Sequence, residues 1–172
     1  MPIYALGAST PTIHPEAFVH PDAVVIGDVH IGAESTVWPG AVLRGDYGTI
    51  RIGARTSIQD GTVVHAGPGF PTLVGDDCVV GHLAHLEGCR IEDVALVGSG
   101  SVVLHHAVVE TGATVGANAV VPNTMVVPSG ALAVGVPATI RPDRSNRALI
   151  KVSADEYVAN GHRYRHELRR LG

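Results

Sequence analysis

A small aliphatic residue returns at about every sixth position through most of this chain. A period of six matches neither a helix of 3.6 residues per turn nor the alternation of an ordinary strand. It is typical of hexapeptide repeats, in which each hexad forms one short strand and one turn of a parallel β-helix. In the longest run, a single step of five residues interrupts the period. That run is Val74, Val80, Leu86, Ile91, Val97, Val103, Val109, Val115, Val121 and Val127.

The same spacing starts earlier, and two insertions interrupt it. The insertions are Arg44–Arg51 (RGDYGTIR) and Ala66–Thr72 (AGPGFPT), and the second has the Gly and Pro content of a loop. Residues 1–12 are expected to form a lead-in strand and cap. We therefore predict a mainly β fold, with a β-helix domain over residues 1–142. The earlier repeat positions are Ile13, Val19, Val25, Ile31, Val37, Leu43, Ile52, Ile58 and Val64.

Residues 143–172 are predicted to form a linker and a carboxy-terminal α-helix. Ser153 followed by Asp155 and Glu156 is a typical helix start, because a hydroxyl caps the free N–H groups and acids suit the first turn. The helix is expected to run to about Leu171. It has too few apolar residues for a core of its own, so we expect it to lie along the solenoid or against a neighbouring subunit.

Composition narrows the classes of partner and location. Aromatic residues make up 4% of the chain, which suits a thin solenoid interior, and the formal net charge is -4. With no basic run before the last ten residues, we expect no nucleic-acid partner. No apolar stretch is long enough to span a membrane, and MPIYALGAST lacks the charged start of a secretion signal. Cys78 and Cys89 are expected to be reduced thiols, which favours a cytoplasmic protein.

Counting hexads places candidate ligands side by side. Three hexads make one coil, so Val64 and Leu86 fall on the same face in successive coils. His65 and Glu87 directly follow them and share one outward slot, with neighbouring strands about 4.8 Å apart. Arg44 holds the same slot one coil earlier. The predicted column is Arg44, His65 and Glu87.

His82 falls on a different face, two places after Val80. It is therefore badly placed to meet His65 and Glu87 of its own chain, whereas a threefold trimer brings it against them from a neighbouring subunit. Two imidazoles and a carboxylate make an acceptable catalytic Zn²⁺ set with one position left open. The alternative is an interfacial His–Glu hydrogen bond without metal. By the same count Asp60 lies one coil before His82, where it can accept the second N–H of that ring.

Four motifs in order resemble the γ-class carbonic anhydrase-like proteins, over roughly Ala17–Arg141. This resemblance implies a left-handed parallel β-helix and a homotrimer with one metal site at each subunit interface. It also implies reversible hydration of CO₂ to bicarbonate by a metal-bound hydroxide, with Zn²⁺, or Fe²⁺ or Co²⁺ in its place. The motifs are RGD at Arg44–Asp46, IGARTSIQDGTVVHAG at Ile52–Gly67, VGHLAHLEGC at Val80–Cys89 and VGSGS at Val97–Ser101.

The resemblance also implies a ligand set, and here the chain departs from the family. His65 and His82 match the first two His ligands, but Glu87 stands where the pattern GHxxxLHGC has the third. Three interpretations stay open. Glu87 is the third ligand, or His85 replaces it while Glu87 acts as an outer group or base, or the site has lost its metal. A carboxylate ligand makes the site less positive, which should weaken the acidification of bound water.

Supporting residues of the family are better matched. Gln59 corresponds to the residue beside the metal-bound hydroxide and is followed by Asp60, while Arg44 and Asp46 match a pair that bridges the trimer interface. The family's shuttle glutamates have no counterpart in Tyr47–Thr49 or Ala66–Thr72.

Two other functions remain. One is a hexapeptide-repeat acyltransferase or thioesterase, although the chain lacks a long substrate loop. The other is a non-catalytic trimeric metal-binding or scaffold protein, since fold alone does not decide function.

Overall fold

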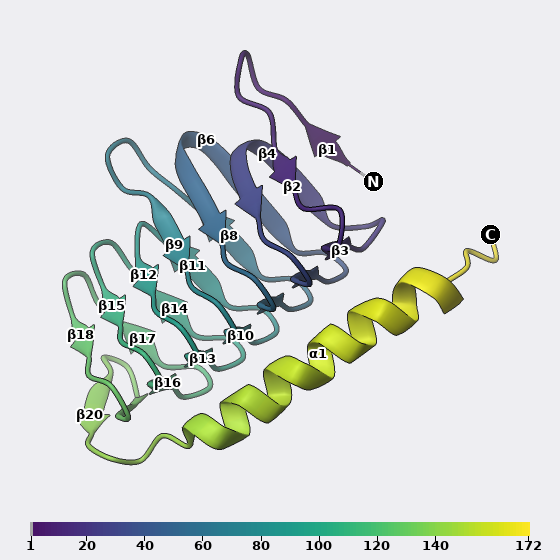
Figure 1. Ribbon diagram of the computed structural model, residues 1–172. Coiled ribbons are helices and arrows are strands. Elements are labelled where there is room, and N and C mark those ends of the chain that lie inside the picture. Colours follow the sequence, from purple (N-terminus) through teal and green to yellow (C-terminus); the bar gives the residue numbers. More distant parts are fainter. Residues whose placement is uncertain (1) are drawn as a thin grey trace.

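The computed structural model describes residues 2–172, and they form a left-handed parallel β-helix with one long helix alongside it (Figure 1). Each coil contributes a short strand to each of three faces. Strands on one face stack in parallel register, coil upon coil, and the one antiparallel pair among the described strands, β19 with β20, closes the far end. The predicted fold class is confirmed.

The first and second faces belong to one continuous sheet, because two long strands turn the corner between them. These strands are β4 (Val24–Ile31) and β6 (Val42–Ile52). The first face adds β1 (Ile3–Tyr4), β8 (Val63–His65), β11 (His85–Glu87), β14 (Val102–Val103) and β17 (Val120–Val121). The second face adds β2 (Thr12–Ile13), β9 (Thr72–Val74), β12 (Arg90–Ile91), β15 (Val108–Val109) and β18 (Val126–Val127).

The third face is a separate sheet, and its strands run along the side that the helix covers. The strands are β3 (Phe18–Val19), β5 (Thr36–Val37), β7 (Ser57–Ile58), β10 (Val79–Val80), β13 (Leu96–Val97), β16 (Thr114–Val115), β19 (Leu132–Val134) and β20 (Thr139–Arg141).

The hexad positions form the core of the solenoid. From Val19 onward every predicted repeat position is buried, and Ile13 at the open end packs partly against the same cluster. A second buried column of Ala residues, such as Ala84, Ala95 and Ala107, fills the corners. A solenoid this thin admits one branched side chain per hexad, so the six-residue period and the narrow interior have the same cause.

The first insertion does not break the strand that contains it. RGDYGTIR lies within β6, which pairs with β8 through Val42–Arg44 and with β9 through Ile50–Ile52. Gly45 passes so close to β4 that a Cβ there would stand 2.5 Å from the Asp28 carbonyl oxygen, so no larger residue fits. The second insertion is a loop as predicted, closed by a bridge between Gly67 and Phe70, and its last residue, Thr72, already belongs to β9.

The helix α1 (Arg147–Glu167) starts six residues before the predicted start at Ser153 and ends before Leu171. Asn146, not Ser153, is the N-cap, and its side chain accepts a hydrogen bond from Leu149 N at 3.1 Å. The extra turns are stabilised by Ile150, which is 2% exposed against the solenoid. An asparagine cap and one buried aliphatic residue therefore outweigh the weaker local signal at Ser153.

The buried face of α1 packs along the third face. Trp38 stands between Tyr157 and Tyr164 of the helix, with ring centroids 5.7 and 5.0 Å away. Gly161 lets the helix approach closely, because a Cβ there would stand 2.6 Å from Thr36 Cγ2. Of the two expected placements, the chain therefore adopts the one along its own solenoid.

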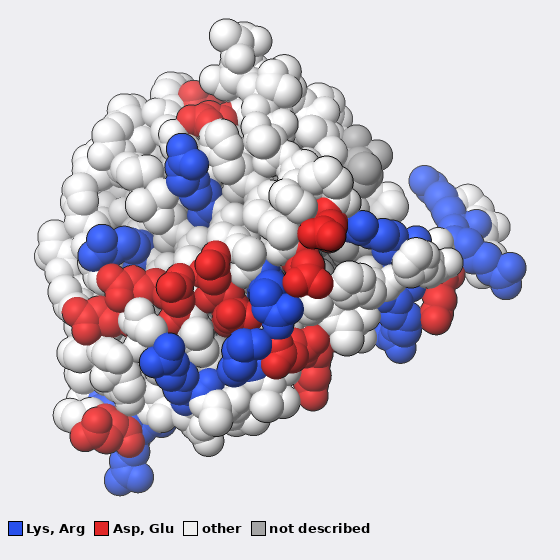
Figure 2. Space-filling model, in the orientation of Figure 1, with Lys and Arg blue, Asp and Glu red and all other residues white. Residues whose placement is uncertain are grey.

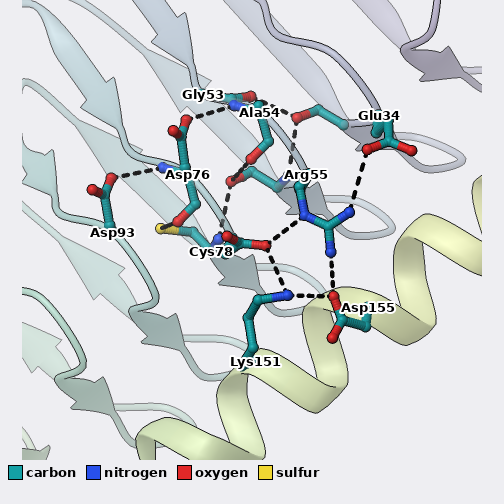
Figure 3. A network of polar contacts seen from close by, with 12 residues as sticks. Glu34, Gly53, Ala54, Arg55, Asp76, Cys78, Asp93, Lys151 and Asp155 are labelled. Carbon is teal, nitrogen blue, oxygen red and sulfur yellow. Dashed lines mark hydrogen bonds and ion pairs between the residues drawn. The ribbon is translucent and has the colours of Figure 1, made fainter.

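A polar network also ties α1 to the corner between the second and third faces (Figure 3). Arg55 is central, with Nε 2.9 Å from Asp77 Oδ1, Nη1 3.3 Å from Glu34 Oε2 and a close contact to Asp155 of the helix. The hydrogen bond and charge of Asp77 raise the pKa of Arg55, so the guanidinium stays charged. Lys151 joins the same carboxylates from the helix side.

Charged side chains are mixed on the face seen in Figure 2. Lys and Arg lie among Asp and Glu there and do not form one basic stripe. Among residues 2–172, no helix has the length and apolar character needed to cross a membrane.

Candidate functional site

His65 and Glu87 stand side by side on the first face, as the hexad count predicts. Strands β8 and β11 pair with His65 opposite Glu87, and β6 places Arg44 opposite His65 on the other side. His65 Nδ1 lies 2.9 Å from Glu87 Oε1. The predicted column of three side chains is therefore present, with its last two members in direct contact.

Asp46 holds the other side of the His65 ring. Its Oδ1 lies 2.9 Å from His65 Nε2, and its other oxygen pairs with Arg44 of the same chain. The sequence interpretation placed an Arg44–Asp46 pair across the trimer interface, whereas in the structure the two residues pair within one chain, and the contact of Asp46 with His65 was missed. Only an imidazolium can donate to both Asp46 and Glu87. In a neutral ring, one nitrogen is free to act as a ligand while the other stays held by a carboxylate.

Both carboxylates are stabilised in their charged forms. Burial alone would raise the pKa of Asp46, but hydrogen bonds from His65 and Arg44 outweigh it and the pKa lies below its ordinary value. The hydrogen bond from His65 is the largest cause of the lowered pKa of Glu87, and His85 adds to it. The site therefore presents carboxylate oxygens near neutral pH, as a metal centre requires.

Glu87 is surrounded by three imidazoles. Besides His65, Nε2 of His85 lies 3.2 Å from Glu87 Oε2, and Nε2 of His105 lies 3.7 Å from Oε1. His105 was missed in the sequence. The hexad count could have identified it. Val103 lies one coil after Leu86 on the same face, and His105 comes two residues after Val103, which places it near Glu87.

The loop Ala66–Thr72 closes over this cluster. The ring of Phe70 packs against His105 and His106, with centroids 5.3 and 4.7 Å away. Gly88, with φ +60°, leaves room for these rings, since a Cβ there would stand 2.7 Å from His105 Cδ2 and 2.9 Å from Phe70 Cβ. The loop and the glycine together fix where His105 can lie.

His82 belongs to a second group, at the corner between the third and first faces. Its Nδ1 lies 2.9 Å from Asp60 Oδ2, the contact that the coil count predicts. Within the described part of the chain, His82 has no contact with His65 or Glu87. Nor do residues 2–172 contain a group of three His, Cys, Asp or Glu side chains arranged to hold a metal.

Gln59 lies beside this second group and away from His65 in the same chain. It is 4% exposed, and its backbone N–H donates to the Val80 carbonyl at 3.0 Å. Burial raises the pKa of the neighbouring Tyr157, and the charge of Asp60 adds to the rise. The predicted residues thus fall into two sets. Arg44, Asp46, His65 and Glu87 lie together, and Gln59, Asp60 and His82 lie together at another corner.

The donor atoms suit a metal with nitrogen and oxygen ligands. In both His65 and His82 a carboxylate can hold one ring nitrogen, which is the usual way of orienting a metal-binding imidazole. Two ligands of a tetrahedral zinc stand about 3.3 Å apart. The 2.9 Å between His65 Nδ1 and Glu87 Oε1 needs only a small opening to reach that value. The residues present therefore fit such a metal if the two sets come from two subunits.

Comparisons with known proteins agree with this fold. The family model for the bacterial transferase hexapeptide (six repeats) matches residues 10–45. A mitochondrial γ carbonic anhydrase 2 of Arabidopsis thaliana is 41% identical over 157 residues, which are 87% of this chain and 56% of that protein. The chain spans about half the length of the curated relatives it matches.

Two solved structures resemble nearly all of the chain. A Bacillus cereus protein provisionally described as an acetyltransferase has a TM-score of 0.92 and 34% identity, covering 94% of this chain and 95% of its own. A hexapeptide transferase family protein from Anaplasma phagocytophilum has a TM-score of 0.90 and 34% identity, with 95% and 98% covered.

Proposed function

Because this chain belongs to the hexapeptide-repeat family that includes the γ-class carbonic anhydrase-like proteins, we propose that it hydrates CO₂ reversibly at a metal centre between subunits. His65 and Glu87 of one chain and His82 of its neighbour are the proposed ligands, and the assembly is a homotrimer. Zn²⁺ is the proposed metal, with Fe²⁺ or Co²⁺ as substitutes. A cytoplasmic location is part of the proposal and is supported by two unpaired cysteines.

One observation carries this proposal. His65 and His82 lie on different corners of the solenoid, yet in each an aspartate carboxylate lies 2.9 Å from one ring nitrogen, Asp46 in one case and Asp60 in the other. A histidine that only stabilises a subunit contact does not need such an arrangement, whereas a metal-binding imidazole does, because the held nitrogen sets the direction of the other. In a closed trimer, the corner of one chain with His65 and Glu87 can meet the corner of the next chain with His82 at each of the three interfaces.

Each residue has a proposed task. When bound, the metal supplies the Lewis acidity that makes a water molecule nucleophilic toward CO₂. Gln59 orients that nucleophile from the neighbouring corner. Asp46 and Asp60 orient the two imidazoles, while Arg44 neutralises Asp46 and helps to join the subunits. Addition of hydroxide to CO₂ would give bicarbonate, and the proton lost by the original water would pass to solvent.

Glu87 sets the expected rate. A carboxylate ligand cancels one positive charge that three neutral imidazoles would leave on the metal, so its water is less acidic. The positions of the family's shuttle glutamates are occupied by Tyr47–Thr49 and by the loop Ala66–Thr72, which contain no acid. We expect hydration slower than in an enzyme with three His ligands.

Two measurements on one preparation test the proposal. Protein purified without a metal-chelating tag is analysed for metal content and for CO₂ hydration by stopped flow. One metal per chain together with hydration supports it. Metal without hydration favours a thioesterase or a binding protein, and a stable trimer that takes up no added Zn²⁺ or Co²⁺ leaves a scaffold.

A hexapeptide-repeat acyltransferase or thioesterase is the second candidate. Its support is the likeness to the Bacillus cereus protein provisionally described as an acetyltransferase. Against it, the longest loop beside the candidate ligands is only Ala66–Thr72, and Phe70 of that loop packs onto His105 and His106. Hydrolysis of short acyl-CoA thioesters by the same preparation separates the two candidates.

A further inference from the structure

We infer that His85 and His105 are positioning residues for Glu87: His85 holds Oε2, so that the carboxylate acts as a ligand through Oε1 only, and His105 limits where Oε1 can lie. This inference rests on the proposed metal centre and goes beyond it. In this inference His85 is not a metal ligand but holds Glu87 in place. His105, which has no counterpart in the motifs of the resemblance, also helps to position Glu87.

The two oxygens of Glu87 face different partners. Oε1 points to His65, with Nδ1 at 2.9 Å, so it lies where a metal shared with that ring would bind. Oε2 points back along its own strand to His85, with Nε2 at 3.2 Å. Because an ionised carboxylate only accepts hydrogen bonds, His85 Nε2 carries the hydrogen. His85 Nε2 therefore donates to Oε2 and has no lone pair for a metal.

His105 backs the carboxylate from the coil after it. Its Nε2 is 3.7 Å from Oε1, too long for a hydrogen bond, and the two groups attract each other by charge when the ring is protonated. Phe70 packs on this ring at 5.3 Å, and Gly88 leaves the space that the ring occupies. Along the solenoid axis, the carboxylate of Glu87 thus lies between the rings of His65 and His105.

The contact between His85 and Oε2 affects how Glu87 can bind a metal. A free Glu side chain can bind a metal through both oxygens, which would occupy a coordination position that a reactive water needs. With Oε2 held by His85, Glu87 takes one position, as an imidazole would. Two His and one carboxylate oxygen then leave the fourth place of a tetrahedral metal open. The contact between His85 and Oε2 is therefore expected to compensate in geometry for the replacement of the third histidine.

Binding of Co²⁺ to the trimer of this chain tests the inference, because the visible spectrum of Co²⁺ distinguishes four-coordinate from higher-coordinate metal. His85→Ala and His105→Ala are each expected to bind Co²⁺ about 10- to 100-fold more weakly, as is typical of outer residues of metal sites. The spectrum of His85→Ala should also shift toward higher coordination, because Oε2 is then free to bind the metal. His85→Gln, which keeps an N–H donor, should restore both properties. His106→Ala is the matched control, since His106 also packs on Phe70 but is not among the hydrogen-bond and ion-pair partners of Glu87.

Each outcome is decisive. Unchanged affinity and spectrum in both alanine variants overturn the inference and leave the proposed function standing. Complete loss of Co²⁺ in His85→Ala, with binding retained in Glu87→Ala, makes His85 the ligand and also overturns it. Wild-type trimer that binds no Co²⁺ overturns the proposed function and this inference with it. Circular dichroism of each variant confirms that the β-helix is folded.

Discussion

Asp60 lies one coil before His82 and holds its ring, with Oδ2 2.9 Å from Nδ1. Since the carboxylate can only accept, Nδ1 carries the hydrogen and Nε2 of a neutral ring remains free as a ligand. This free nitrogen is on a different corner from His65 and Glu87. This arrangement suits a metal site to which two neighbouring chains each contribute ligands.

Mixing two inactive variants should restore metal binding. His65→Ala removes a proposed ligand on the first face, and His82→Ala removes the proposed ligand on the other corner. Each variant alone is expected to form trimers without metal. After unfolding and refolding together in equal amounts, about one quarter of the interfaces contain an intact His65 and an intact His82. Metal content measured on the refolded trimer should rise to about that fraction.

The control mixture is His65→Ala with Glu87→Ala. Both residues come from the same chain of each interface, because they pair in register on β8 and β11. No interface of this mixture regains a full set, so its metal content should stay at background. Recovery in both mixtures, or in neither, contradicts a site shared between subunits in this way.

Replacing Glu87 by His should speed CO₂ hydration. A neutral imidazole leaves more positive charge on the metal, so the bound water loses its proton at lower pH. Each unit by which that pKa falls gives about ten times more hydroxide at a pH below it. The pH profile of stopped-flow hydration for Glu87→His should have its midpoint at lower pH than the wild type. A profile with the same midpoint contradicts the role given to Glu87.

Both cysteines should resist alkylation in the folded protein. Burial raises the pKa of Cys78 and of Cys89 to about 12, so neither forms a thiolate between pH 7 and about pH 9. Iodoacetamide at pH 8 is expected to label no site in the native protein and two sites after denaturation, as counted by mass spectrometry. Labelling of the native protein at either cysteine shows that the solenoid opens locally at that coil.

A side chain at Gly161 should loosen the helix from the third face. In Gly161→Val the new atoms meet Thr36 Cγ2 within 2.6 Å, and we expect a loss of about 2 kcal/mol in the free energy of unfolding. Thr36→Ser removes that methyl group and should recover part of the loss in the double variant. Ala159→Val, on the exposed side of the same helix, is the control. Denaturant unfolding that finds equal losses at both positions contradicts close packing at Gly161.

The six-residue period was enough to predict the register of the β-helix. It placed Glu87 beside His65 and Asp60 beside His82, and both contacts are present in the structure. The reason is that every hexad repeats the same local geometry, so counting residues is equivalent to measuring position along the solenoid. The metal and the trimer remain predictions, because they depend on groups outside one chain.

Only the tertiary structure decided what happens where the period is broken. Asp46 reaches His65 because the insertion in β6 continues as a strand around a corner, and His105 reaches Glu87 because Phe70 and Gly88 shape its surroundings. The helix begins at its Asn146 cap because the solenoid buries Ile150 in the first turns of the helix. Repeats determine position through local geometry, whereas insertions, corners and the helix take their places from contacts between residues far apart in the chain.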